Sequence, residues 1–183
     1  MQNESENRKV NLILDGAHTR ESMFAFCEWI SCLKESKNGE NVLIFNCNQT
    51  KNIESLLLEL IKIDKMLNFS IIVFTSNDIS QNENNPHTKH PYKHSPSNPP
   101  PYSSLSTGVN WQEKMLEIWK SNSDSSQNKK FLVSPCLKHS FNFIQSNLSP
   151  SLDSNQIPNL FVTGSLYLIG SVFKYIKYNI DDL

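Results

Sequence analysis

Short apolar runs alternate along the chain with longer segments in which apolar residues recur at helical spacing. The runs are 10–14, 42–45, 71–74, 131–133 and 160–162. After the first run, Thr19 is a predicted N-cap, and Met23, Phe26, Cys27 and Ile30 follow at the spacing of one helix face. Apolar strands without polar alternation, separated by amphipathic helices, are typical of a parallel sheet covered on both faces. The pattern predicts a Rossmann-like, doubly wound α/β fold with a mostly parallel sheet.

Three polar stretches interrupt this pattern, at 77–108, 121–128 and 149–158. They are rich in Ser and Asn, and the first also contains three consecutive prolines. Such segments bury too little apolar area to offset the entropy lost on ordering. We therefore expect one α/β domain over 10–180, a disordered N-terminus at 1–9, and long disordered insertions at these three places.

Charge and cysteine content exclude several classes of protein. With 17 Lys and Arg against 18 Asp and Glu, the formal net charge is −1, which argues against nucleic acid or an anionic membrane surface as a partner. The four cysteines lack metal-ligand spacing, so we expect reduced, buried thiols in a reducing compartment. Segment 154–173 is uncharged but contains Pro, Gly and several amides, and the first residues show no secretory signal. A cytoplasmic location is expected, with a mitochondrial one left open.

Two glycines, Gly16 and Gly164, each follow a predicted strand and precede a predicted helix. In open parallel sheets ligands bind beyond the carboxyl ends of the strands, where helix N-termini offer free N–H groups. Asp15 could accept from ribose hydroxyls, and a neutral His18 could donate to a phosphate oxygen. The equally weighted alternative is an ordinary tight turn, in which Asp15 bonds backbone amides and His18 is merely exposed.

The second turn consists of Thr163, Gly164 and Ser165, whose hydroxyls and amides could bind an anion. Taken alone, Ser165 is better interpreted as the N-cap of the last helix. Gly170 lies inside that helix, where we expect it to permit close packing on the sheet.

Other combinations of reactive side chains are weaker. A metal site at His87, His90 and His94 would lie in a flexible segment without supporting contacts, so we predict no metal site. Cys27 with His18 could form a thiol nucleophile, but Cys27 lies on an apolar helix face where thiols are usually inert. The chain contains no phosphate-binding loop motif of its own.

Segment 12–19 (LILDGAHT), followed by Ser22 and Trp29, resembles the carboxy-terminal domain of folylpolyglutamate synthases, which belong to the Mur ligase group. Segment 161–170 (FVTGSLYLIG) is similar to the VTGSLHLVGG segment of the same family. Shorter matches lie between them in the family's order, so the resemblance covers nearly the whole chain.

The resemblance implies an ATP-dependent ligase of one-carbon metabolism. ATP would phosphorylate the γ-carboxyl of a reduced folate, and the amine of L-glutamate would then attack the acyl phosphate. It also implies that ATP and Mg²⁺ are held mainly by an amino-terminal P-loop domain, acting in cis or in trans, over which this domain closes. By position, Asp15, Gly16 and His18 would contact ATP, and His18 would also be an active-site, catalytic residue. The turn 163–165 would bind an anion or glutamate.

The chain departs from the family pattern in three places, and the altered segment around Lys51 favours a second hypothesis, a non-catalytic nucleotide- or protein-binding remnant. Arg8 lies upstream of the first strand without the family's PGRxQ motif. Segment 45–53 lacks the aspartates of the family's FNxTGDRDP, and Lys51 stands where an arginine is expected. Tyr167 replaces the usual histidine. With half of the phosphate-binding residues absent, we expect no turnover by the chain alone.

Overall fold

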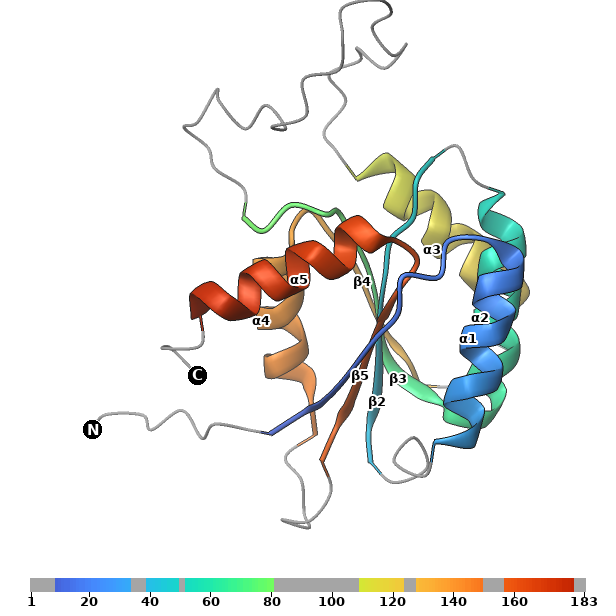
Figure 1. The fold of residues 1–183 in the computed structure, drawn as a ribbon, viewed down its shortest axis with the longest axis horizontal. Helices are drawn as coiled ribbons and strands as arrows, with labels where there is room; N and C mark the ends of the chain where they lie inside the picture. The colour runs from blue at the N-terminus through green and yellow to red at the C-terminus, as the bar shows by residue number, and fades with distance from the viewer. Residues whose placement is uncertain are drawn as a thin grey trace, which may run out of the picture.

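A computed structural model of the chain describes residues 9–33, 39–49, 52–80, 109–123, 128–149 and 157–179. Strands and helices alternate throughout (Figure 1). In chain order they are β1 (Asn11–Leu14), α1 (Arg20–Cys32), β2 (Asn41–Phe45), α2 (Ile53–Leu67), β3 (Phe69–Thr75), α3 (Asn110–Asn122), β4 (Lys130–Ser134), α4 (Leu137–Asn147), β5 (Asn159–Thr163) and α5 (Leu166–Asn179). Each apolar run of the sequence is a strand, and each helically spaced segment is a helix.

The strands form one parallel sheet in the order β1-β5-β2-β3-β4. Helices α1, α2 and α3 cover one face, and α4 and α5 cover the other (Figure 1). The predicted α/β fold class, with a doubly wound parallel sheet, is therefore confirmed. Strand β5 lies between β1 and β2, so the last strand of the chain separates the first two.

The sheet buries apolar side chains on both faces, which explains the lack of polar alternation in its strands. In β2, Leu43 and Phe45 pack under α1 to α3, whereas Val42 and Ile44 pack under α4 and α5. All four side chains are almost completely buried. Among the described residues, none of the helices has both the length and the apolar character that crossing a bilayer demands.

The edges of the predicted insertions differ from the structure where they can be compared. Backbone amides of Leu137 and Lys138, at the start of α4, donate to the carbonyls of Asp78 and Ile79 at 2.8 and 2.9 Å. Asp78 and Ile79 therefore satisfy the first amides of α4, and residues 121–122 belong to α3. The remaining central parts of the three insertions, and residues 1–8, lie outside the described residues.

Two expectations about single residues were wrong. Gly170 is exposed, and a Cβ added to it would meet no atom within 4 Å, so it makes no close packing on the sheet. All four cysteines are free, but Cys32 is exposed rather than buried, because it lies in the last turn of α1 on the side away from the sheet.

An asparagine ladder joins the amino ends of β1, β5 and β2. Asn11 donates its side-chain amide to Oδ1 of Asn159 at 3.0 Å, and Asn159 donates to Oδ1 of Asn41 at 2.9 Å. Asn41 in turn donates to the carbonyl of Leu67. Because the three residues occupy matching positions in the register, the ladder fixes the alignment of these strands.

Replacing the central asparagine tests the ladder. Asn159→Leu should lower the free energy of unfolding by about 2–3 kcal/mol, because buried amide groups of its neighbours lose their partners. Asn11→Ala, at the half-buried end, should cost about 1 kcal/mol or less. Urea denaturation of the two variants measures both values, and equal losses would contradict a central role for Asn159.

Candidate functional site

Three turns meet at the carboxyl edge of the sheet, and together they form the candidate site. The Asp15 amide donates to the Val162 carbonyl at 3.0 Å, and the Asn46 amide approaches the Thr163 carbonyl at 3.4 Å. We call residues 15–18, Asn46 and 163–165 the rim. The helix after β1 leaves toward one face of the sheet and the helix after β5 toward the other (Figure 1). Such a reversal is the usual ligand position in open α/β sheets.

The two glycines of the rim are explained by contacts between its turns. A Cβ on Gly16 would overlap the Leu166 side chain, and one on Gly164 would overlap the Asn46 carbonyl and the Phe45 ring. Gly164 also has φ +104°, a conformation that other residues rarely adopt. Both glycines were expected to admit a ligand, but in the structure they allow neighbouring turns to approach each other.

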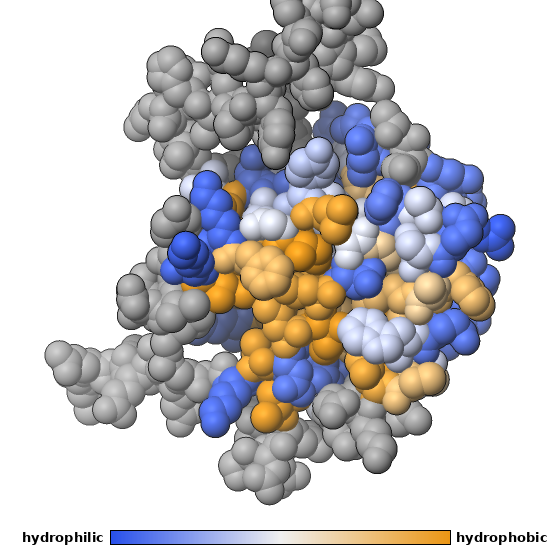
Figure 2. All heavy atoms as spheres, in the orientation of Figure 1, coloured by the Kyte–Doolittle hydropathy of each residue, from blue (hydrophilic) through white to orange (hydrophobic). Residues whose placement is uncertain are grey.

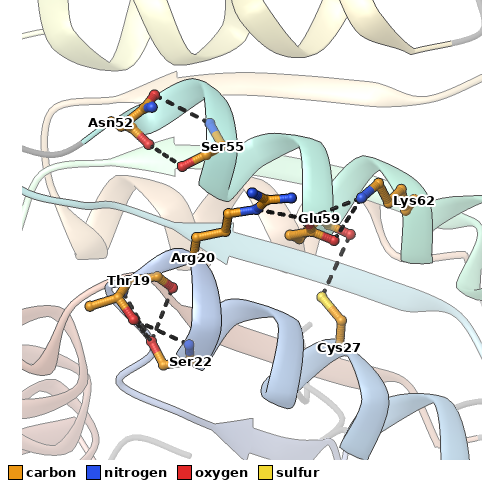
Figure 3. A network of polar contacts seen from close by, with 8 residues as sticks. All are labelled: Thr19, Arg20, Ser22, Cys27, Asn52, Ser55, Glu59 and Lys62. Carbon is orange, nitrogen blue, oxygen red and sulfur yellow. Dashed lines mark hydrogen bonds and ion pairs between the residues drawn. The ribbon is translucent and has the colours of Figure 1, made fainter.

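The first turn satisfies its own backbone groups. The Ala17 amide donates to Asp15 Oδ1 at 2.7 Å, and the His18 amide donates to Ser22 Oγ at 3.1 Å. Thr19 is the N-cap of α1 and forms a reciprocal capping box with Ser22, which Figure 3 shows. The contacts of this turn match the tight-turn alternative, and most of the amides expected to be free for an anion are occupied by the chain itself.

His18 is exposed at the tip of this turn, and the orientation of its ring determines which hydrogen bonds its two nitrogens can form. Its Nδ1 lies 3.1 Å from the carbonyl oxygen of Gly16, which can only accept, so Nδ1 carries the proton of this hydrogen bond. In the neutral ring Nε2 is then an acceptor. A neutral His18 in this geometry would accept from a hydroxyl or amine, whereas donation to a phosphate oxygen would need the imidazolium form.

The second turn begins α5. Ser165 Oγ accepts from the Tyr167 amide at 3.2 Å, and the Ser165 carbonyl accepts from Ile169 at 3.2 Å, so Ser165 occupies the N-cap position. Thr163 differs from its neighbours, because its Oγ1 is completely buried and has no hydrogen-bond partner. The register of β1 and β5, continued by one residue, sets Thr163 beside Asp15 on the side of α1. Among the described residues of the rim, Thr163 Oγ1 is thus the buried side-chain polar atom without a hydrogen-bond partner.

A polar network next to the rim was not predicted from the sequence. Gln112 of α3 donates to Asn46 Oδ1 at 3.2 Å and to the Thr75 carbonyl at 3.3 Å, while Asn46 donates to Asn77 Oδ1 at 2.8 Å. Gln112 is buried, and its Oε1 has no partner. The available signal was its spacing, since Gln112 precedes the buried Met115 by three residues and therefore falls on the apolar face of its helix.

A separate hollow of about 310 Å³ lies between the start of α1 and the outer side of α2. Three of its charged groups pair with one another: Glu59 accepts from Lys62 at 3.0 Å and from Arg20 at 3.5 Å (Figure 3). With Glu54 also in its lining, the hollow carries two cations and two carboxylates, so it has no excess positive charge for an anion.

Two alternative chemistries gain no support. Burial, with smaller contributions from Glu59 and Glu28, raises the pKa of the Cys27 thiol to about 12, and its Sγ lies 3.6 Å from the Glu59 carbonyl. Within the described ranges, no group of three or more His, Cys, Asp or Glu could hold a metal ion. Lys51 and the histidines at 87, 90 and 94 lie outside those ranges.

A matched pair of glycine substitutions tests the rim's geometry. Gly164→Ala should lower the free energy of unfolding by about 2 kcal/mol or more, because φ is positive there and the new methyl group would overlap Asn46 and Phe45. Gly170→Ala should instead raise it by about 0.5–1 kcal/mol, since open space surrounds that helix position. Thermal denaturation of both variants provides the comparison, and a tolerated Gly164→Ala would contradict the tight approach of the turns.

The cysteines should differ sharply in reactivity. Because the pKa of Cys27 is raised to about 12, its thiol stays protonated at pH 8 and should resist iodoacetamide, whereas the exposed Cys32 should react. Mass spectrometry of the native protein should find alkylation at Cys32, and Cys32→Ser should remove it. Alkylation of Cys27 below pH 10 without unfolding would contradict the inert assignment.

Comparisons with known proteins agree with the resemblance in the sequence. No family model matches the chain. A Caenorhabditis elegans protein named "Putative folylpolyglutamate synthase" is 26% identical over 179 residues, covering 93% of this chain and 31% of that protein. The structure of Mycobacterium tuberculosis folylpolyglutamate synthase, complexed with ADP and AMPPCP, has a TM-score of 0.54 and 14% identity, covering 89% of this chain and 29% of that one. The chain thus resembles folylpolyglutamate synthases along most of its length while spanning less than a third of either protein.

Proposed function

We propose that this chain is the carboxy-terminal domain of an ATP-dependent folylpolyglutamate synthase, which adds L-glutamate to the γ-carboxyl of reduced folates. The two similar proteins supply the ligase class, and the structure of one of them was determined with ADP and AMPPCP. Since the chain covers less than a third of each, the P-loop and most groups that hold Mg²⁺ would lie in a second, amino-terminal part. The isolated chain would be inactive.

The observation that carries this proposal is the unsatisfied Thr163 hydroxyl at the meeting point of the turns. A buried hydroxyl without a partner costs about 1–3 kcal/mol, so such groups in native structures call for an explanation. Thr163 lies between β1 and β2, directly before the N-terminus of α5. A ligand group bound at the rim, after a small shift of the turn, would give this hydroxyl its partner.

The rim residues then take different roles toward a nucleotide. Asp15 has one carboxylate oxygen engaged by the Ala17 amide and can direct the other, Oδ2, to a ribose hydroxyl. His18 would act as a hydrogen-bond acceptor through Nε2 in its neutral form. Gly164 and Ser165 would place the positive end of α5 toward an anion, either a phosphate or the glutamate carboxylate.

The self-satisfied first turn also supports a second candidate, a non-catalytic domain that kept the fold. With most amides of that turn occupied by Asp15, Thr19 and Ser22, the rim is complete as a structural element without a nucleotide. On this alternative, rim substitutions would change stability but not nucleotide use.

A fusion enzyme separates the two candidates. We define the companion half as the part of the C. elegans relative that this chain does not match, and join it covalently to the chain. Asp15→Ala should raise the KM for ATP by about tenfold or more, the equivalent of one charge-assisted hydrogen bond. Thr163→Val should also raise this KM, yet leave the isolated chain as stable or slightly more so, because it removes an unpaired polar group without changing side-chain shape.

The matched control is Asp78→Ala, which removes an exposed carboxylate at the same edge of the sheet but after β3, two strands away from β5. Its KM for ATP should equal that of the unmodified fusion. If the fusion binds no ATP and makes no glutamylated folate, the proposed function is wrong. If it is active but ignores both rim substitutions, the assignment of the rim is wrong.

A further inference from the structure

The outward face of α5 presents an unusual concentration of apolar surface. Leu166, Tyr167 and Phe173 are exposed by 68%, 72% and 59%. Leu166, Gly170 and Phe173 are spaced by four and three residues, so they form one stripe along the helix. Figure 2 shows apolar atoms gathered across the middle of this view, over α5 and β1. Single exposed apolar residues are ordinary, whereas a contiguous patch marks an interaction site.

Because Gly170 has no side chain, it leaves a gap in this apolar stripe. Glycine inside a helix is unfavourable relative to alanine, and such a residue is commonly explained by close packing against a neighbouring element. Within the described residues nothing approaches it, since an added Cβ would meet no atom within 4 Å. The missing side chain therefore leaves a notch between Leu166 and Phe173 that this chain itself does not use.

We propose that the stripe formed by Leu166, Tyr167, Gly170 and Phe173 is the docking surface for the companion half, with an apolar side chain of that half seated in the Gly170 notch. The inference rests on the proposed function, because it takes the partner to be the rest of the ligase. The C. elegans relative extends well beyond the 31% of its length that this chain matches, so its remaining polypeptide is large enough to cover the stripe.

The position of the stripe supports the companion half as the partner that covers it. Helix α5 starts directly after the rim, and Leu166 packs so close to Gly16 that a Cβ there would overlap it. A polypeptide seated on α5 is therefore brought beside the rim. That is the place where the phosphate-binding groups that this chain lacks must be delivered for the rim to take part in ATP chemistry.

Binding of separate chains tests the docking surface. The unmodified chain and the companion half should associate in isothermal titration calorimetry. Gly170→Leu and Phe173→Ser should each raise the Kd of this association by at least tenfold. Gly170→Leu enters open space on a helix, so it should keep or raise the melting temperature and cannot act by unfolding the chain. The matched control is Met66→Ser, which removes a comparably exposed side chain (49%) from α2 and should leave the Kd unchanged.

Failure of docking and failure of the proposed function give different results. No association of the unmodified chain, or equal affinities for the stripe variants and the control, overturns the docking surface, whatever the covalent fusion does. An inactive fusion, with separate chains that still bind through the stripe, overturns the proposed function alone. Sedimentation equilibrium of the chain by itself should show a monomer; a dimer that Gly170→Leu dissociates would assign the stripe to a second copy and overturn the proposal.

Discussion

Hydrogen bonding of β5 to β1 on one side and to β2 on the other is the constraint on which the candidate site depends. The position of β5 between β1 and β2 brings turns that are nearly 150 residues apart in the chain into contact. It also places the exits toward α1 and α5 on opposite faces, so that the carboxyl edge opens between them. If β5 paired elsewhere, Asp15 and Thr163 would not be neighbours, and neither turn alone would differ from many ordinary helix starts.

The sequence predicts the elements well, because two-sided burial leaves uninterrupted apolar runs such as 42–45 and 160–162. Strand order is not accessible in the same way, since every strand carries a similar apolar run and pairing depends on contacts distant in sequence. Gly170 shows a second limit: a glycine within a helix looks the same in the sequence whether a sheet packs against it or open space surrounds it.

The meeting of the two glycine turns could be predicted from the sequence, whereas their contacts could not. Both turns follow parallel strands, whose carboxyl ends share one edge of a sheet, and the structure brings them together there. The spacing of residues does not show that Asp15 Oδ1 accepts from the Ala17 amide, or that Ser22 Oγ accepts from the His18 amide. The network around Gln112 could be predicted only by knowing which helix packs against β3, and local spacing does not contain this information.

The asparagine ladder has a consequence for the opposite end of the same three strands. The hydrogen bonds among Asn11, Asn159 and Asn41 hold the amino ends of β1, β5 and β2 in register, so the strands resist sliding past one another. A ligand at the carboxyl ends would then be accommodated by side-chain rotations and small movements of the loops. A preorganised edge of this kind would lose little of a ligand's binding free energy to rearrangement of the strands.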